Sequence, residues 1–342
     1  MSPFLITRTL PEDATDAALR ADVQRGLTRT PKTLPPKWFY DAHGSELFEK
    51  ITELPDYYPA RAERELLIAR SADIAAVTGA RTLIELGSGS SAKTRYLLDA
   101  MPDLDTYVPV DVSESVLMQA GHALIEDRPG LNVHALIADF TTGLALPGTP
   151  GPRLLAFLGS TIGNFLPRER ATLLSSIRSL LSPGDALLLG TDLVKDEGPL
   201  IAAYDDTTTG VTAAFNKNVL SVLNRVLGAD FDLDAFEHVV RWDAANEWIE
   251  MRLRSRTDQT VKIPALSLTV DFAAGEELRT EVSIKFREPA LRRELALWGL
   301  EVTRWWTAGP LYGLALARPS TPPTTARTDG ASRRPYVDDG SS

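Results

Sequence analysis

The sequence contains no cysteine among its 342 residues. This absence excludes a disulfide framework, a metal site held by thiolates and a cysteine nucleophile. Histidine is scarce as well, and the complete set is His43, His122, His134 and His238. Because none of them forms an HxxxH or HxH pair, we expect no metal site.

Excess positive charge and long apolar runs are also lacking. Lys and Arg number 36 against 46 Asp and Glu, which gives a formal net charge of −10. A nucleic-acid partner requires clustered basic side chains, so we expect none. No apolar stretch approaches the roughly 20 residues of a membrane-spanning helix, and residues 1–10 do not have the pattern of a signal peptide. We therefore expect a soluble, cytoplasmic protein that makes no membrane contact and is a monomer.

What the sequence does contain is a regular alternation of strands and helices between residues 81 and 190. Short apolar strands are expected at 81–86, 106–112, 133–140, 154–160 and 185–193, with a helix at 168–181. Near-continuous apolar strands are typical of a parallel sheet that is covered on both faces. The sequence therefore predicts an α/β fold with a doubly wound, Rossmann-like sheet. Two further strands, 301–306 and 312–318, are expected to pair antiparallel at one sheet edge.

The pattern changes from about residue 205. A helical segment is followed by segments that alternate with period two, as half-buried antiparallel strands do. We infer that 205–285 is an insertion late in the α/β unit, and that the N-terminal residues 1–60 pack with it. Beyond Arg318 the chain is rich in Thr, Pro, Gly, Ser and Asp, so residues 320–342 are expected to form a disordered tail.

Three strand ends carry residues that suit a nucleoside cofactor. The first strand ends at Gly87-Ser88-Gly89, where small residues let the backbone turn sharply and approach a ligand. Asp111 closes the second strand and suits two ribose hydroxyls, while Asp139-Phe140 closes the third strand and suits an adenine. Each feature alone has a plain structural reading, as a turn or a helix cap. Their shared order favours a cofactor, and the missing third glycine favours S-adenosylmethionine over a nicotinamide.

Three further features suit a small polar substrate. Gly159 to Asn164 follow the fourth strand, where ligands of open α/β sheets lie. The Asn164 amide suits a zwitterionic amino acid. A simple Gly-Asn turn is equally consistent with this segment. Tyrosines at positions 40, 57, 58 and 204 either pack at the junction of the two units or offer ring faces to a cation. Glu281, Ser283 and Lys285 share one face of an alternating strand, which can also be a solvated face.

Together these segments resemble one known family. KWFYDAHGSELFEKITELPDYYPAR, ELGSGSSAKT, FLGSTIGN, LLGTDLVKD, GVTAAFN and TEVSIKF are similar to the L-histidine Nα-methyltransferases of ergothioneine biosynthesis. The likeness runs from about Ala17 to Arg318, and only the first sixteen residues and the tail depart from it. It implies a class I methyltransferase domain from 61–194 and 286–319. It also implies a second, substrate-binding α+β domain from 1–60 and 195–285.

The resemblance also implies an activity and a set of site residues. The activity is trimethylation of the α-amino group of free L-histidine to hercynine, with S-adenosylmethionine as methyl donor and no metal. The cofactor would be bound by Tyr40, Gly87, Lys93, Asp111, Asp139 and Phe140. L-Histidine would be bound by Tyr57, Asn164, Tyr204, Met251, Glu281 and Ser283. The residues nearest the reacting amine would be Asn164, Tyr40 and Gly159.

Three other functions remain open at this point. The same fold can methylate another amino acid or amine. A nicotinamide-dependent oxidoreductase would bind NAD(P)H instead, and a non-catalytic regulator would bind an adenosyl ligand without turnover.

Overall fold

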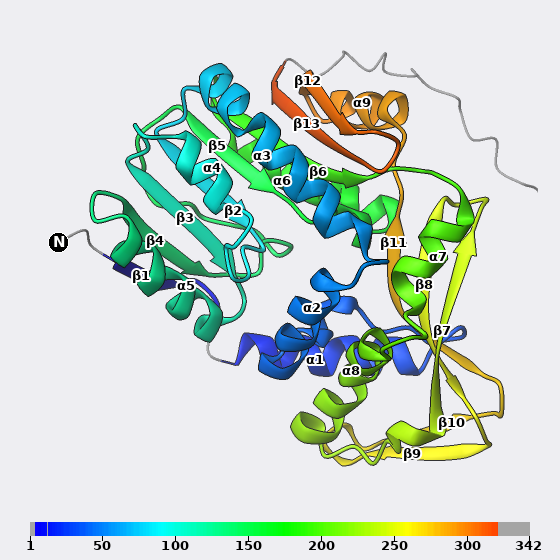
Figure 1. Cartoon of the computed structure of the whole chain (residues 1–342). Helices are drawn as coiled ribbons and strands as arrows, with labels where there is room; N and C mark the ends of the chain where they lie inside the picture. Colours follow the sequence, from blue (N-terminus) through cyan, green and yellow to red (C-terminus); the bar gives the residue numbers. More distant parts are fainter. Residues whose placement is uncertain (1–3, 12, 321–342) are drawn as a thin grey trace, which may run out of the picture.

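An eight-stranded sheet forms the centre of the larger of two units (Figure 1). The structure, a computed structural model, describes residues 4–11 and 13–320. Across the sheet the strands are β1 (Phe4–Arg8), β4 (Asn132–Ile137), β3 (Thr106–Asp111), β2 (Thr82–Leu86), β5 (Arg153–Phe157), β6 (Ala186–Asp192), β13 (Tyr312–Pro319) and β12 (Leu300–Ala308). Neighbours from β1 to β6 are parallel, whereas β13 is antiparallel to both β6 and β12. The predicted doubly wound sheet and its antiparallel C-terminal pair are confirmed.

Helices cover both faces of this sheet. On one face lie α3 (Tyr58–Thr78), α4 (Arg95–Ala100) and α5 (Glu114–Asp127), and on the other lie α6 (Pro167–Leu180) and α9 (Glu288–Leu297). The alternation of β2 explains this arrangement, because Leu83 packs with α3 and α4 while Ile84 packs with α6 and α9. Since both faces are covered, every residue of β2 is buried. Three of the five are apolar, and the buried Glu85 carboxylate accepts from the hydroxyls of Thr94 and Tyr107.

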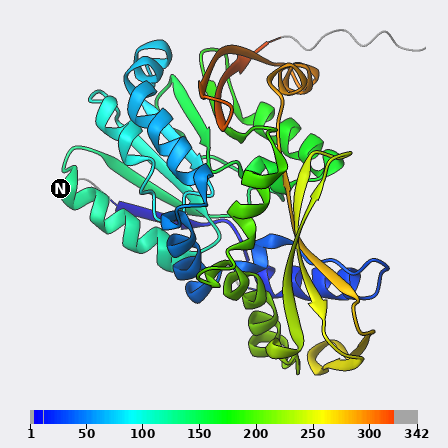
Figure 2. The same ribbon diagram turned by 45° about the vertical axis from the view of Figure 1, so that its right-hand side comes forward.

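The second unit combines helices with a small antiparallel sheet (Figure 2). The sheet has the order β11-β8-β7, and a hairpin of β9 and β10 lies beside it. Its elements are α1 (Ala14–Leu27), η1 (Pro36–Phe39), α2 (Ala42–Glu53), α7 (Glu197–Asp205), α8 (Val211–Leu227), η3 (Leu233–Ala235), β7 (Phe236–Asp243), β8 (Trp248–Ser255), β9 (Gln259–Ile263), η4 (Pro264–Leu266), β10 (Leu268–Phe272) and β11 (Glu277–Ile284). One apolar core joins the N-terminal helices to this insertion, including Phe39, Phe215 and Leu253.

The N-terminal segment is divided between the two units, which corrects one expectation. Residues 1–60 were expected to pack as a whole with the insertion, but β1 pairs parallel with β4 at the edge of the large sheet. The sequence hides this strand because an edge strand is held mainly by backbone hydrogen bonds and buries little. Leu5 and Ile6, for example, remain 53% and 37% exposed. No alternating apolar pattern is therefore required of it.

The two units meet at the carboxyl ends of the central strands. There, η2 (Thr161–Asn164) follows β5 and lies against β11. A Cβ atom at Gly163 would stand only 2.7 Å from the carbonyl oxygen of Ile284, so glycine permits this close approach. A β-bridge between Leu193 and Phe286 joins the end of β6 to the residues after β11. The strand of the second unit is thus fixed directly above the sheet edge where ligands of this fold bind.

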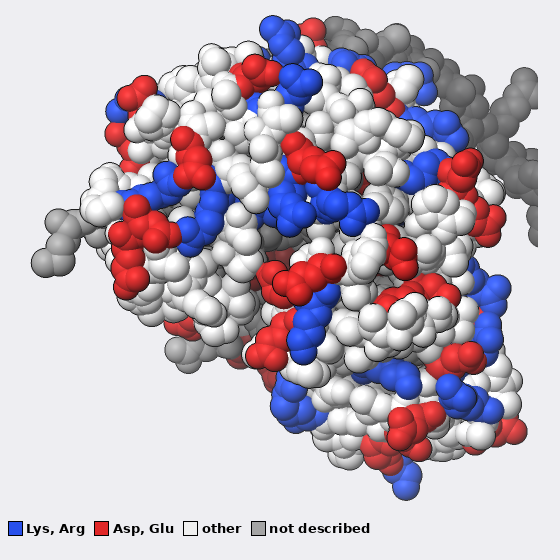
Figure 3. All heavy atoms as spheres, viewed as in Figure 1, with Lys and Arg blue, Asp and Glu red and all other residues white. Residues whose placement is uncertain are grey.

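Two surface properties can be compared with expectation. In the face shown in Figure 3, Lys and Arg side chains are interspersed with Asp and Glu, so this face has no continuous basic surface. Among the described residues, no helix combines the length and apolar character needed to cross a membrane. The expected tail falls, beyond Ser320, outside the described residues.

Candidate active site

The ends of β2, β3 and β4 converge around a glycine turn. Gly87 and Gly89 have φ values of +65° and +50°, in the left-handed region that favours glycine. The Gly89 amide donates to Asp111 Oδ2 over 3.1 Å, and the Ser113 amide donates to Oδ1 over 2.9 Å. A Cβ atom at Gly87 would lie 3.7 Å from the Phe140 ring. The structure therefore brings together the strand ends that the sequence singled out.

The two acidic side chains at this edge have different surroundings. Burial raises the pKa of Asp111 in spite of the backbone amides that bind its carboxylate. Asp139 accepts from the Thr141 amide over 2.9 Å and lies 3.7 Å from Lys37 Nζ. Phe140 packs edge-on to Phe157, with ring centroids 5.4 Å apart, so its ring is held beside the glycine turn.

Glu63 is a site residue that sequence reasoning missed. It lies on α3, is fully buried, and accepts hydrogen bonds from Lys93 Nζ at 2.5 Å, the Gly159 amide at 2.7 Å and the Tyr312 hydroxyl at 2.7 Å. Its carboxylate thereby holds Lys93 next to Gly159. A signal for it exists in the sequence, because Glu63 shares the buried helix face of Leu66 and Leu67, and a buried carboxylate needs partners.

Aromatic rings line the junction between the two units. The rings of Tyr57 and Tyr204 are 6.0 Å apart, and Tyr40 packs edge-on to Phe48 and Phe215 at 5.5 and 5.3 Å. Tyr204 is buried, whereas Tyr40 is 39% exposed. Loss of solvent around the two hydroxyls, followed by nearby negative groups that include Glu281, raises the pKa of both. The phenols are therefore neutral at ordinary pH and available as hydrogen-bond donors.

A β-bulge in β11 determines which face of the small sheet carries the predicted substrate residues. Before the bulge, Glu277 and Arg279 lie opposite Arg254 and Arg252 of β8; after it, Glu281 lies opposite Met251. The extra residue, Thr280, shifts the alternation by one position. Without it, Glu281 would lie on the same face as Arg279.

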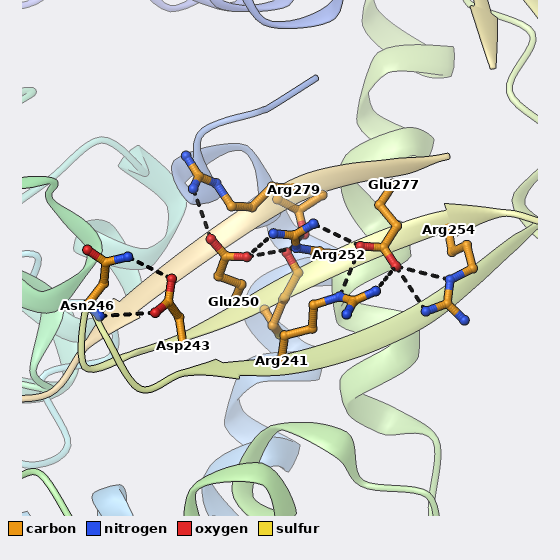
Figure 4. A network of polar contacts seen from close by, with 10 residues as sticks. Arg241, Asp243, Asn246, Glu250, Arg252, Arg254, Glu277 and Arg279 are labelled. Carbon is orange, nitrogen blue, oxygen red and sulfur yellow. Dashed lines mark hydrogen bonds and ion pairs between the residues drawn. The ribbon is translucent and has the colours of Figure 1, made fainter. Parts of the chain in front are cut away.

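The face opposite the site carries a network of ion pairs (Figure 4). Glu277 accepts from Arg241, Arg252 and Arg254, and Glu250 pairs with Arg252 and Arg279. Met251, which is only 2% exposed, faces the other side with Glu281. The bulge thus separates a charged outer face from the inner face that meets the large sheet.

Glu281 is held at the junction by Asn164. The Asn164 Nδ2 donates to Glu281 Oε1 over 3.2 Å and to the Val282 carbonyl over 2.9 Å. Burial raises the pKa of Glu281 to about 7, although Lys285 and Asn164 act in the opposite direction. Both amide hydrogens of Asn164 are used within the protein, which leaves its Oδ1 as the atom that can accept from a ligand.

Ser283 and Tyr204 form a second polar group, around Lys285. Their oxygen atoms are 2.8 Å apart, and Lys285 Nζ lies 2.8 Å from Ser283 Oγ and 2.9 Å from the Tyr204 hydroxyl. Lys285 also pairs at 2.9 Å with Asp192, which in turn binds Lys195 and the Tyr58 hydroxyl. The sequence indicated that Lys285 shares a face with Ser283, but the role of Asp192 was missed.

No cluster of three or more His, Asp or Glu side chains able to hold a metal ion occurs among residues 4–11 and 13–320. Three of the four histidines have other contacts. His122 packs against Phe4, His134 lies 2.8 Å from the Thr7 hydroxyl, and His238 lies between Asn216 Nδ2 and the Tyr204 carbonyl at 2.8 and 2.9 Å.

Comparison with known proteins identifies the family of this chain. A family model described as histidine-specific, S-adenosylmethionine-dependent methyltransferase matches residues 19–319. The chain belongs to this family. It is therefore a methyltransferase, as the sequence predicted, and the oxidoreductase alternative is wrong.

Three relatives are similar to this chain to different degrees. Histidine N-alpha-methyltransferase from Mycolicibacterium smegmatis is 57% identical over 313 residues, which cover 90% of this chain and 97% of the relative. The protein of the same name from Mycobacterium tuberculosis is 55% identical, covering 91% of this chain and 98% of the relative. Ergothioneine biosynthesis protein 1 of Neurospora crassa is 28% identical over 84% of this chain and 33% of its own length.

Proposed function

We propose that this methyltransferase transfers three methyl groups to the α-amino nitrogen of free L-histidine and produces hercynine, the first step of ergothioneine biosynthesis. Two relatives above 50% identity carry the name histidine N-alpha-methyltransferase. The structural observation that carries the proposal is the inner face of β11, where Glu281 and Ser283 stand two positions apart beside the tyrosines. A carboxylate and a hydroxyl at this spacing suit the two nitrogens of an imidazole.

The residues at the sheet edge fit S-adenosylmethionine. The positive φ of Gly87 and Gly89 leaves room for the backbone to approach a ligand. We assign Asp111 to the ribose hydroxyls and Asp139 with Phe140 to the adenine. Lys93 and Tyr40 are assigned to the amino-acid end of the cofactor. Lys93 Nζ lies beside Gly159, and Tyr40 is near enough to Glu281 and Asp111 for both carboxylates to raise the pKa of its hydroxyl. When bound, this cofactor supplies a methyl group on a positively charged sulfur.

The substrate would lie across the junction. Glu281 would accept the imidazole N–H, Ser283 would bind the other ring nitrogen, and Tyr57 and Met251 would flank the ring. Tyr204 would donate to the carboxylate, and Asn164 would join it only by exchanging its 3.2 Å hydrogen bond to Glu281 for one to the ligand. For the amine, Asn164 Oδ1 and the Gly159 carbonyl are the suitable acceptors, because the Gly159 amide already donates to Glu63.

The chemistry requires little beyond positioning. Methyl transfer would be an in-line displacement. The ammonium would first lose a proton to water, the nitrogen lone pair would then attack the methyl carbon, and the electron pair of the broken C–S bond would stay on the departing thioether. An array that holds the amine in line lowers the barrier through proximity and orientation. As methyl groups accumulate, the nitrogen becomes a permanent cation, and faces of Tyr40, Tyr57 and Tyr204 would stabilise it by about 0.5–2 kcal/mol each.

The test is incubation of the purified protein with S-adenosylmethionine and each of several free amino acids and amines. Mass spectrometry should detect mono-, di- and trimethylated histidine and, with extended time, only the trimethylated form. Faster methylation of another amino acid, such as tryptophan, would contradict the assignment of histidine and favour the alternative substrate.

We also propose that the enzyme works as a monomer in the cytoplasm. In support, one chain supplies all of the residues assigned above, and the sequence has no cysteine to require an oxidising compartment. Light scattering during size-exclusion chromatography would test the monomer; a dimer mass at micromolar concentration would contradict it.

A further inference from the structure

Lys285 is a buried cation that the proposed mechanism leaves without a role. Its side chain has no exposed surface, although the ammonium of lysine is strongly hydrated in water and costly to bury. It follows β11 directly, on the same inner face as Glu281 and Ser283. Burying an ammonium costs desolvation free energy, so its position next to the side chains assigned to the substrate needs a physical reason.

All three ammonium hydrogens of Lys285 have acceptors. They are Asp192 Oδ2 at 2.9 Å, the Tyr204 hydroxyl at 2.9 Å and Ser283 Oγ at 2.8 Å. An ammonium group donates and cannot accept. Lys285 therefore has no hydrogen left for a ligand, and it forces both hydroxyl oxygens to act as acceptors toward itself.

This arrangement controls where the two hydroxyl hydrogens go. Without the ammonium, the Asp192 carboxylate would be the strongest acceptor near Ser283 and Tyr204, and their hydrogens would turn toward it. With the ammonium in place, that carboxylate is occupied by Lys285, Lys195 and Tyr58. One hydroxyl hydrogen lies in the 2.8 Å hydrogen bond between Ser283 Oγ and the Tyr204 hydroxyl, and the other points away from Lys285. A ligand that offers a ring nitrogen and a carboxylate would take both hydrogens by replacing that bond.

We propose that Lys285 is a specificity-determining residue, which orients the Ser283 and Tyr204 hydroxyls as donors so that the pocket selects a ring with one N–H and one unprotonated nitrogen. This inference rests on the proposed function. Glu281 offers an acceptor to the ring, and Ser283 offers a donor. Neutral imidazole satisfies both, whereas an apolar ring or a doubly protonated imidazolium leaves one of them unmatched.

The test compares two ligands of similar shape in the presence of S-adenosylhomocysteine. L-Histidine and L-2-thienylalanine share the carboxylate and amine, but the thiophene ring has neither an N–H nor a ring nitrogen. Calorimetric competition would give the affinity for L-histidine divided by the affinity for L-2-thienylalanine. In Lys285→Met this affinity ratio should fall about tenfold relative to wild type, the loss expected for one hydrogen bond. A merely structural role would weaken both ligands alike and leave the ratio unchanged.

Lys195→Met is the matched control, because Lys195 also pairs with Asp192 at 2.5 Å and is buried but does not contact Ser283 or Tyr204. Its ratio should stay within about threefold of wild type, less than the value of one hydrogen bond. An equal fall in both variants, or an unchanged ratio in Lys285→Met, would overturn the proposal.

Two additions keep the result decisive. In a Ser283→Ala background, Lys285→Met should change the ratio by less than about twofold, because the hydroxyl through which it acts is gone. If Lys285→Met does not fold, Lys285→Gln serves instead: its amide oxygen would accept a hydroxyl hydrogen, so the ratio should also fall.

A wild-type protein that does not methylate histidine would refute the proposed function. A wild-type protein that does so, with an unchanged ratio in the variants, would refute only this inference.

Discussion

The cofactor half and the substrate half of the site are built in different ways. The assigned cofactor residues Gly87, Asp111, Asp139 and Phe140 all lie at, or within three residues of, the carboxyl end of a parallel strand of the large sheet. The assigned substrate residues Tyr57, Asn164, Tyr204 and Glu281 come from segments of both units that only the tertiary fold brings together. In the first half a single rule of topology places the residues; in the second, contacts between the two units do.

The two halves also differ in how they support a carboxylate. Asp111 accepts from two backbone amides, those of Gly89 and Ser113, and so does not depend on a partner side chain. Glu281 depends on one side chain, Asn164, and its pKa is raised to about 7 by burial. The cofactor half should therefore tolerate distant changes better than the substrate half.

The largest expected effect is in the cofactor half. Asp111→Ala should weaken S-adenosylmethionine binding by about 100-fold or more, because two charge-assisted hydrogen bonds to the ribose would be lost. Calorimetry would measure it. Asp105→Ala, just before β3 and paired only with the surface residue Arg81, is the control and should bind normally. Retained affinity in Asp111→Ala would place the ribose elsewhere.

Glu281→Ala should separate the two halves. The histidine dissociation constant should rise roughly 10- to 100-fold through loss of a charge-assisted hydrogen bond, while S-adenosylmethionine affinity stays within about twofold. Glu277→Ala, four residues earlier but on the opposite face with the arginines, should leave histidine affinity unchanged. An equal loss of affinity for histidine and for S-adenosylmethionine in Glu281→Ala would mean that the cofactor half depends on Glu281 as well.

The same contrast explains what sequence reasoning achieved. The succession of strands and helices along the chain, the glycine turn and the acidic strand ends could be predicted because apolar runs and turn residues are local signals. The substrate residues were assigned to histidine only through the resemblance to a family. Nothing in the sequence near Tyr57 indicates that the Tyr204 ring lies 6.0 Å from its own ring. The positions of these residues agree with one shared site, but their roles remain predictions.

Other features left no readable signal. Edge strand β1 buries too little to produce a pattern. The bulge at Thr280 leaves the sequence alternation of Glu281, Ser283 and Lys285 intact but reverses their face relative to Glu277, so only the register could reveal it. Asp192 ends a buried strand as many aspartates do, and its ion pair with Lys285 spans a long sequence separation.

The pH dependence of stability can test how strongly the fold changes the pKa of the Glu281 carboxyl. The pKa of Glu281 rises from 4.5 in an unfolded chain to about 7 in the fold. Between these values the folded protein binds the extra proton, so wild-type stability declines as pH rises through this window. Glu281→Gln has no such proton. Its unfolding free energy should therefore exceed that of wild type by about 3 kcal/mol more at pH 8 than at pH 4.5.

Urea denaturation of both proteins across this range would provide the measurement. Glu85 also has its pKa raised to about 7 by burial, but it is present in both proteins and cancels in the difference. A stability difference that does not change with pH would show that Glu281 titrates normally and that its burial has little electrostatic cost.

The smallest expected effect tests whether the substrate half depends on distant contacts at all. The Thr280 hydroxyl lies 2.5 Å from Asn216 Oδ1 and 3.0 Å from the Met251 carbonyl, which fixes the bulge against α8. Asn216 in turn contacts His238, whose other ring nitrogen is 2.9 Å from the Tyr204 carbonyl. One polar chain therefore links the strand of Glu281 to the helix of Tyr204.

Thr280→Val keeps the side-chain shape and removes the hydroxyl, so histidine should bind about five- to tenfold more weakly, as expected for loss of one hydrogen bond that positions the bulge. Cofactor affinity should not change, because no cofactor residue touches this chain of contacts. Thr280→Ser retains the hydroxyl and should bind histidine nearly as wild type does. If valine and serine variants weaken histidine equally, methyl packing rather than the hydrogen bond holds the bulge. If neither weakens it, backbone pairing alone sets the register, and the substrate half is as locally determined as the cofactor half.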